Sequence, residues 1–302
     1  MTYTTMQEIV DAVCRQQTRV RVAVAAADDR HVLEAVFHAQ SEGIADPVLV
    51  GDAERITALL TELGLEGRSY ELVGTAPEES PAQRAVELIA AGRAEFLMKG
   101  RLDTRDLLLP VVNRTNNLHT GRTMSLMAFH QLPGYHKLLV TTDGGMIPHP
   151  DLPMKRDIIL NAVETLRRMG YEHPKVAVLC GIEKPNPKMP ETLDAEALVE
   201  MNRQGEIPGC TVVGPISYDL AMSREIAVIK GYACPHVQDF DVLVVPNLAA
   251  GNILGKCIAV SAGGSMSGII VGAKIPVVLT SRGATAQEKF HALALAALAA
   301  RR

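Results

Sequence analysis

The chain has few cysteines, and their arrangement excludes the classes of protein that depend on them. Five occur in 302 residues, an odd number, and no Cys-x-x-Cys pair is present. Disulfide-stapled secreted domains need an even set of cysteines, and thiolate zinc sites need paired ones. The sequence therefore predicts a protein without a disulfide framework, in a reducing, cytoplasmic compartment. The cysteines are Cys14, Cys180, Cys210, Cys234 and Cys257.

Long apolar runs and an excess of positive charge are also missing. No stretch of about 18 apolar residues occurs, so no membrane-spanning helix is expected. Residues 1–13 contain acidic groups and no long apolar core, which argues against a signal peptide. The formal net charge is −4, so nothing attracts the chain to nucleic acid or to an anionic membrane. Small molecules are the expected partners.

The common phosphate-binding and metal-binding motifs are absent as well. No G-x-x-x-x-G-K-[ST] sequence occurs, which argues against a nucleoside triphosphatase. The glycines of residues 142–146 do not form G-x-G-x-x-G, which weakens a dinucleotide-binding interpretation. His149 has no second histidine at a spacing suited to a metal ligand, so no metal site is expected.

Strand-like and helix-like segments alternate along most of the chain. This alternation predicts a mostly parallel sheet flanked by helices, and the number of strands favours two α/β domains with a cleft between them. Residues 123–131 and 137–142 differ, because they are consecutive strands joined by a Leu-Pro-Gly turn. An antiparallel excursion is expected there, near the crossing between the domains.

The tail of the chain is the most suggestive candidate site. Residues 277–279 are typical of a short buried strand, and a tight polar turn with Ser281 and Arg282 follows. Arginine binds phosphate or carboxylate with a planar fork of donors, so the turn predicts an anion site. Glu288 could be an acid/base group beside it. Residues 285–288 also form an S/T-x-x-E capping box, however, and that role is as well supported.

Two further segments carry cations and hydroxyls. Lys99 ends the strand-like residues 96–98 and could face an anionic ligand, although most lysines are simply solvated. Thr123 and Ser125 lie two residues apart and so share one side of a strand. With Arg122 nearby they could hold phosphate oxygens, or they could form the polar face of an exposed strand.

Two glycine-containing segments follow predicted strands. Gly144 and Gly145 come after Asp143 and could allow the backbone to approach a ligand closely, although Asp-Gly is also a common turn. Asn252 could line a pocket or cap a helix predicted over residues 253–261, and the cap is slightly favoured.

Taken together, these segments resemble the phosphate acetyl/butyryltransferase family, and its phosphate butyryltransferase branch most closely. The resemblance extends from about residue 96 to the C-terminus. Before that point only the alternation of strands and helices is similar. The ordered set of segments that carries it comprises residues 98–100, 118–122, 142–146, 174–179, 186–190, 209–215, 249–252 and 280–282.

The family resemblance implies an activity and a fold. The activity is the reversible transfer of a short acyl group between coenzyme A and inorganic phosphate, with coenzyme A as a substrate and no bound cofactor or metal. The fold is two α/β/α domains of the isocitrate/isopropylmalate dehydrogenase type with the site in the cleft. Residues 1–130 with 282–302 would form one discontinuous domain and residues 131–281 the other. A homo-oligomer, dimer or larger, is also implied.

The resemblance also implies roles for the residues. Ser281, Arg282 and Glu288 match catalytic positions of the acetyl branch. Arg282, with Lys99 and Ser125, would bind the phosphoryl group. Glu288 would take the thiol proton, because the thiolate is the nucleophile. Arg122, Asp143, Gly144, Gly145 and Asn252 would bind substrate.

The chain departs from the butyryl branch at several points. A histidine that is common after the serine at position 125 is Leu126 here, and the usual asparagine at position 147 is Ile147. Leu109 stands where relatives carry Arg or His, and Ala284 where they carry Asp. The length of the acyl chain is therefore left open.

Two other functions remain open from the sequence. One is a metal-dependent 3-hydroxyacid dehydrogenase of the same fold, although the C-terminal half has no tight D-x-x-x-D ligand pair. The other is a non-catalytic relative that binds coenzyme A or phosphate without turning it over.

Overall fold

The computed structural model describes residues 2–16, 19–280 and 284–300. Residue contacts divide the chain into two compact units. The central unit consists of Met1–Thr5 and Thr123–Met266, and the terminal unit of Met6–Arg122 and Ser267–Arg302. Each unit therefore contains segments that lie far apart in the sequence.

This division differs from the boundaries predicted at 130/131 and 281/282. The first boundary lies at 122/123, because β5 (Ser125–Gln131) is hydrogen-bonded to β6 (Leu139–Thr142) of the central unit. The second lies at 266/267, because β11 (Val277–Val278) pairs with β4 (Phe96–Lys99) of the terminal unit. Strand pairing decides both positions: between neighbouring segments at the first boundary and between distant ones at the second.

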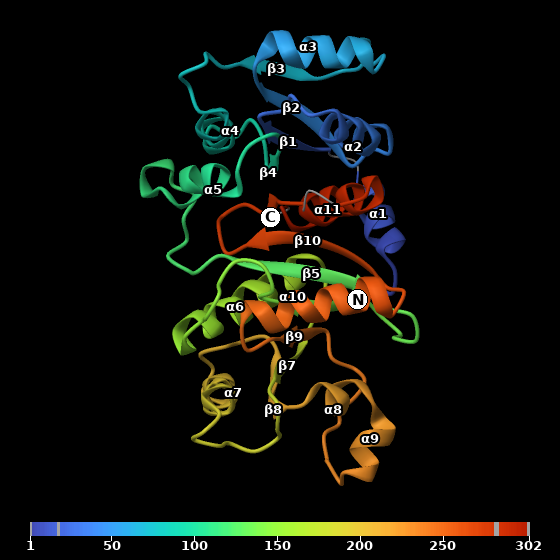
Figure 1. The fold of residues 1–302 in the computed structure, drawn as a ribbon, viewed down its shortest axis with the longest axis vertical. Coiled ribbons are helices and arrows are strands. Elements are labelled where there is room, and N and C mark those ends of the chain that lie inside the picture. The colour runs from blue at the N-terminus through green and yellow to red at the C-terminus, as the bar shows by residue number, and fades with distance from the viewer. Residues whose placement is uncertain (1, 17–18, 281–283, 301–302) are drawn as a thin grey trace. The chain divides into compact units, whose positions relative to one another are not determined.

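The terminal unit alternates strands and helices, as predicted (Figure 1). Its elements are α1 (Met6–Cys14), β1 (Val20–Ala25), α2 (Arg30–Ser41), β2 (Ala45–Gly51), α3 (Ala53–Glu62), β3 (Glu71–Gly74), α4 (Pro81–Ala90), β4, α5 (Thr104–Val112), the 3₁₀ turn η1 (Arg114–Asn116), β10 (Ser265–Val271), which begins two residues before the unit boundary, β11 and α11 (Ala286–Ala299).

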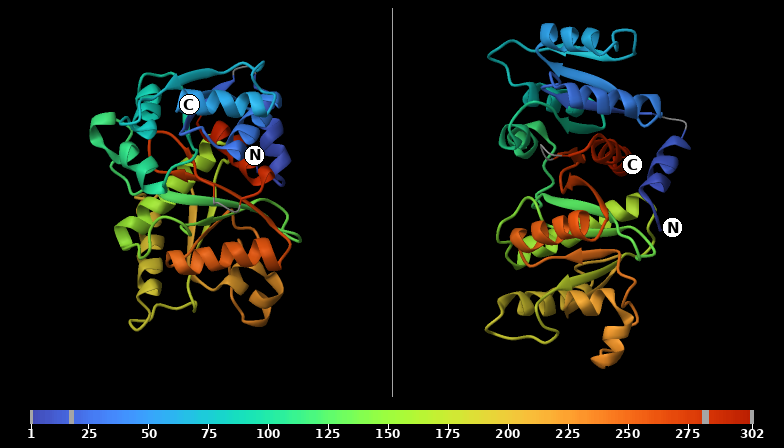
Figure 2. Two further views of the ribbon diagram at one scale, coloured as in Figure 1. Left: turned by 45° about the horizontal axis from the view of Figure 1, so that its top comes forward. Right: turned by 45° about the vertical axis from the view of Figure 1, so that its right-hand side comes forward.

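The sheet of the terminal unit is parallel except at one edge. Its strands run in the order β3-β2-β1-β4-β11-β10, and only the pairing of β10 with β11 is antiparallel among them. Helices α4 and α5 contact each other, and α11 contacts both α1 and α2 (Figure 2). The carboxyl ends of β4 and β11 are neighbours, because Val278 pairs with Met98.

Local sequence explains where several of these helices begin. Asp29 accepts a hydrogen bond from the Val32 N–H at 3.0 Å at the start of α2. Ser80 does the same for the Gln83 N–H at 3.2 Å, and Pro81 follows at the first position of α4. Such caps satisfy N–H groups that have no partner within the helix. Side chains near the ends thus set the helix starts.

The central unit has the same construction. Its elements are β5, β6, α6 (Leu152–Arg168), β7 (Lys175–Leu179), α7 (Pro190–Arg203), β8 (Thr211–Ile216), α8 (Tyr218–Met222), α9 (Arg224–Ile229), β9 (Val242–Val244), α10 (Leu248–Lys256) and a π-helical turn η2 (Cys257–Ser261).

Its strands run in the order β5-β6-β9-β7-β8. All these pairings are parallel except that of β5 with β6, which confirms the predicted antiparallel excursion. A cluster of buried side chains from several strands, including Leu139, Ile216 and Leu243, forms part of the core. Among the described residues, no helix is both long and apolar enough to cross a bilayer.

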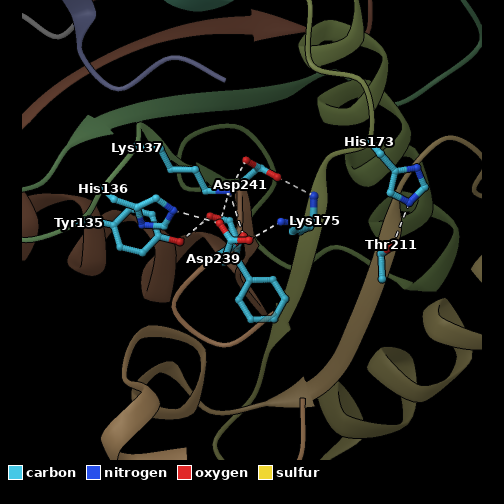
Figure 3. A network of polar contacts seen from close by, with 9 residues as sticks. Tyr135, His136, Lys137, His173, Lys175, Thr211, Asp239 and Asp241 are labelled. Carbon is cyan, nitrogen blue, oxygen red and sulfur yellow. Dashed lines mark hydrogen bonds and ion pairs between the residues drawn. The ribbon is translucent and has the colours of Figure 1, made fainter. Parts of the chain in front are cut away.

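The amino-terminal edge of the central sheet carries a network of charged side chains (Figure 3). Lys137, which is 5% exposed, donates hydrogen bonds to the Asp241 carboxylate at 2.6 Å and to the Asp239 carbonyl at 2.9 Å. The Lys175 N–H donates to Asp241 at 2.7 Å, and the Lys175 ammonium pairs with Asp239. The network thus joins the starts of β6, β7 and β9.

The network also links stability to pH. Burial alone would raise the pKa of Asp239, but the hydrogen bonds from Lys175 and Lys137 outweigh it and hold that pKa below its usual range. A lowered folded-state pKa stabilises the fold above the unfolded value of about 3.9. This contribution is lost as the pH falls below that value.

We predict that Lys137→Met destabilises the protein, because it removes the cation beside the Asp241 carboxylate, which is 4% exposed. Breaking one side of a buried ion pair costs roughly 3–5 kcal/mol. Chemical denaturation at neutral pH measures the loss. Lys230→Met, which removes an exposed lysine paired with Asp219, is the control. Equal losses in the two variants would contradict the prediction.

Candidate functional site

The loop after β6 is organised around the carboxylate of Asp143, which is 2% exposed. Its Oδ1 accepts hydrogen bonds from the N–H groups of Leu126 at 3.1 Å and Gly145 at 3.0 Å. Its Oδ2 accepts one from Ile147 at 2.8 Å, and Met146 donates to both oxygens at 3.1 and 3.2 Å. The side chain thus binds its own loop and the start of β5.

The protonation of Asp143 reflects two opposing effects. Burial raises the pKa of its carboxyl group, because the charged form loses its hydration. The N–H groups of Gly145, Leu126, Ile147 and Met146 act in the opposite direction, since they stabilise the ionised form. A buried carboxylate is an acceptor only, so the ionised form is the one that suits four N–H donors.

The two glycines of this loop are required by neighbouring parts of the protein. A Cβ on Gly144 would lie 2.8 Å from the backbone carbon of Gly251, at the start of α10. A Cβ on Gly145 would lie 2.5 Å from Leu126 Cδ2. The sequence predicted a close approach to a ligand at these glycines, and the structure shows close approaches to Gly251 and Leu126 of the protein itself.

Asn247, and not Asn252, caps α10. The Asn247 side chain accepts a hydrogen bond from the Ala250 N–H at 3.0 Å, whereas Asn252 lies inside the helix. The predicted cap at Asn252 is therefore wrong, because the helix begins five residues earlier than the predicted range 253–261. The exposed Asn252 amide reaches the Gly144 carbonyl at 3.5 Å, a long hydrogen bond. This places Asn252 beside the glycine loop.

The hydroxyl of Ser125 is inside the central unit. Ser125 is fully buried at the first residue of β5, and Asn161 of α6 donates to its Oγ at 3.2 Å. The same Asn161 amide donates to the Thr123 carbonyl at 2.8 Å. The hydroxyl is therefore not accessible from solvent in this structure. Asn161 had no part in the sequence prediction, although an asparagine among the buried apolar residues of α6 is a usable signal.

Lys99 lies at the carboxyl end of β4 in the terminal unit. It is half-buried, and among the described ranges 2–16, 19–280 and 284–300 it has no ion pair. Gly100 follows because a Cβ there would meet the Ala25 carbonyl oxygen at 2.6 Å. Parallel pairing places the end of β11 next to this strand end. Position and charge thus remain compatible with an anion at Lys99.

Glu288 forms the capping box that the sequence predicted as one of its two roles. Its Oε2 accepts a hydrogen bond from the Thr285 N–H at 2.7 Å, and the Thr285 hydroxyl accepts one from the Glu288 N–H at 3.2 Å. Ser267 also donates to the Glu288 carbonyl at 3.1 Å, which ties α11 to β10. Glu288 therefore caps α11, and a role as a base is compatible with this cap.

The remaining predicted residues are Arg122, Ser281 and Arg282. Arg122 is half-buried, and its N–H donates to the Thr120 hydroxyl at 3.3 Å. Ser281 and Arg282 lie outside the described residues. Within the described part of the chain, no group of three or more His, Cys, Asp or Glu side chains is arranged to hold a metal ion.

We predict that Gly144→Ala destabilises the protein, because its Cβ would press on the backbone of Gly251 rather than on a flexible side chain. Overpacking of this kind costs about 1–3 kcal/mol. Thermal unfolding measures the change. Gly67→Ala is the matched control, since a Cβ there meets nothing within 4 Å. A normal melting temperature for Gly144→Ala would refute the close approach.

Comparisons with known proteins identify relatives over almost the whole chain. A family model described as "Phosphate acetyl/butaryl transferase" matches residues 4–84 and 71–297. The chain is 40% identical over 280 residues to a phosphate butyryltransferase of Clostridium acetobutylicum, covering 93% of each chain. It is also 40% identical over 278 residues to a phosphate acetyltransferase of Thermotoga maritima, covering 92% of this chain and 94% of that one.

Solved structures agree with the fold. A branched-chain phosphotransacylase of Enterococcus faecalis is similar with a TM-score of 0.80 at 32% identity, over 93% of this chain and 99% of that one. A 4-hydroxythreonine-4-phosphate dehydrogenase of Klebsiella pneumoniae shares the fold with a TM-score of 0.53 at 17% identity, over 93% of this chain and all of that one. The dehydrogenase-like fold class predicted from the sequence is thereby confirmed.

Proposed function

The chain belongs to the phosphate acetyl/butyryltransferase family, and we propose that this phosphate acyltransferase moves a butyryl or acetyl group reversibly between coenzyme A and inorganic phosphate. The observation that carries this proposal is the 40% identity, over nearly the full chain, to one enzyme of each type. Because the identity to the two enzymes is equal, both a butyryl and an acetyl group are included in the proposal. The dehydrogenase alternative has support from the fold alone.

The proposed reaction is a single displacement with both substrates bound. The thiolate sulfur of coenzyme A attacks the carbonyl carbon of the acyl phosphate, and a C–S bond forms. The C–O bond to phosphate then breaks, and phosphate leaves with the electron pair. The thiol proton passes to a base on the enzyme. Holding the two substrates side by side removes the entropic cost of their encounter, so no covalent enzyme intermediate is needed.

We assign the proton transfer to Glu288. One of its oxygens accepts the Thr285 N–H, and an ionised carboxylate has further lone pairs for a thiol proton. The bond that forms the helix cap also fixes the rotamer of the side chain. A base held in one orientation loses less entropy when it meets its substrate than a mobile one does. The two roles thus support each other.

We assign the phosphate to the cations of the terminal unit. Lys99 ends β4, and Ser281 and Arg282 follow β11, the parallel neighbour of β4. Arg282 would fork onto two phosphate oxygens, Lys99 would supply a point charge, and Ser281 would stabilise the oxyanion of the attacked carbonyl. Arg122 is a further candidate for the phosphate. The Ser125 hydroxyl is engaged by Asn161, so we assign it to supporting β5 instead.

Thiol release from acyl-CoA with added phosphate tests the function. We expect release that depends on phosphate with acetyl-, propionyl- or butyryl-CoA, with the ratio of kcat/KM values defining the preferred chain. Binding of coenzyme A without release would favour a non-catalytic relative. Absence of release with all three thioesters would overturn the proposal.

Glu288→Gln is predicted to reduce kcat by about 100-fold or more, in the range that removal of a general base causes. The melting temperature should change little, because the glutamine oxygen still accepts the Thr285 N–H. Thr285→Ala, which removes the other half of the capping box, is the control and should reduce stability by about 1 kcal/mol while activity persists. Near-normal turnover in Glu288→Gln would assign this residue to capping alone.

The proposed reaction brings several associated properties with it. Coenzyme A is expected as a substrate, with no permanently bound cofactor or metal. We also expect a cytoplasmic enzyme that forms a homo-oligomer, dimer or larger. Gly144, Gly145 and Asn252 are proposed to contact the acyl-CoA substrate, and Asp143 to hold the loop that contains the two glycines.

A further inference from the structure

The loop of residues 143–147 uses its own donors internally. The N–H groups of Gly145, Met146 and Ile147 all point to the Asp143 carboxylate. Anion-binding loops work in the opposite way, because their consecutive N–H groups point outward to a phosphate. The glycines here are explained by contact with Gly251 and Leu126, as described above. Three consecutive donors of the loop are therefore turned inward, away from any phosphate.

Charge leads to the same conclusion. Residues 143–147 contain no lysine, arginine or histidine, and their one ionisable group is an acid. A phosphate carries negative charge, so a buried carboxylate behind the loop would repel it. A neutral ligand avoids this repulsion. The chemistry of the loop is thus suited to an uncharged group.

The accessible surface of the loop offers the groups that such a ligand would contact. Gly145 is exposed and Leu126, which lies against it, is half-buried. Beside them the exposed Asn252 amide makes only a 3.5 Å hydrogen bond to the Gly144 carbonyl. An apolar side chain, an exposed glycine backbone and a side-chain amide complement a ligand that contains amide and methylene groups.

We propose that Asp143 is a positioning residue that shapes the 143–147 loop as the seat of the neutral acyl-thioester arm of the CoA substrate, and not of phosphate. This rests on the proposed acyl transfer. Asp143 does not touch the substrate. It fixes the loop and the start of β5 relative to each other, because one carboxylate bonds Leu126 on one side and residues 145–147 on the other.

Asp143→Asn tests the proposal. An asparagine amide has one acceptor, and its NH₂ group would face the N–H donors of the loop, so the loop must move. We expect the KM for acyl-CoA to rise roughly tenfold, the change that corresponds to about 1.4 kcal/mol of lost binding, while the KM for phosphate stays within about twofold. A change confined to one substrate is not what a general loss of stability produces.

Asp151→Asn is the matched control. Asp151 also accepts a backbone N–H, from Met154 at 2.9 Å at the start of α6, in the same unit. It should reduce the melting temperature and leave both KM values unchanged. If Asp143→Asn does not fold, Gly145→Ala decides, because its Cβ displaces Leu126 without removing the carboxylate. This variant should show the same selective rise in the KM for acyl-CoA.

The outcomes separate this inference from the proposed function. An inactive wild-type enzyme would refute the acyl transfer itself. An active wild type with unchanged KM for acyl-CoA in a folded Asp143→Asn variant would overturn the inference alone. A rise in the KM for phosphate in either loop variant would place the phosphate at this loop, and would overturn it too.

Discussion

The carboxylate of Asp143 is the interaction on which the geometry around the glycine loop depends. Four backbone N–H groups converge on it, one from the start of β5 and three from the loop after β6. A buried N–H left without a partner costs about 1–3 kcal/mol, and the carboxylate accepts from all four of these donors. The loop therefore has one low-energy path, and that path brings Gly144 against Gly251 and Gly145 against Leu126.

The sequence could predict the position of this loop but not which groups it contacts. An Asp-Gly-Gly segment after a buried strand indicates close approach by some group, and β5, β6 and the loop all lie where the pattern predicts them. Which group approaches depends on residues more than a hundred positions away, such as Gly251. The sequence alone therefore could not distinguish a ligand from the backbone of α10. Ser125 is a similar case, because its partner Asn161 lies on a distant helix.

The fold was predictable to the extent that it depends on local patterns. The spacing of apolar residues and the turn residues predict the alternating strands and helices and the antiparallel pair near residue 130. The predictions that differed involve competition between possible caps or pairing at a distance. Asn247 and Asn252 are both good caps, and contacts of α10 with the glycine loop favour the earlier start. The unit boundaries differ because β11 pairs with β4, which is about 180 residues earlier.

The hydrogen bonds at the start of α11 allow Glu288 to be both a helix cap and the proposed base. A general base must be oriented, and orientation requires a partner that does not consume every lone pair. The Thr285 N–H is such a partner, since it engages Oε2 and is itself fixed at the start of α11. In the proposed reaction, the positive charges of Lys99 and Arg282 would favour the thiolate as well as the phosphate.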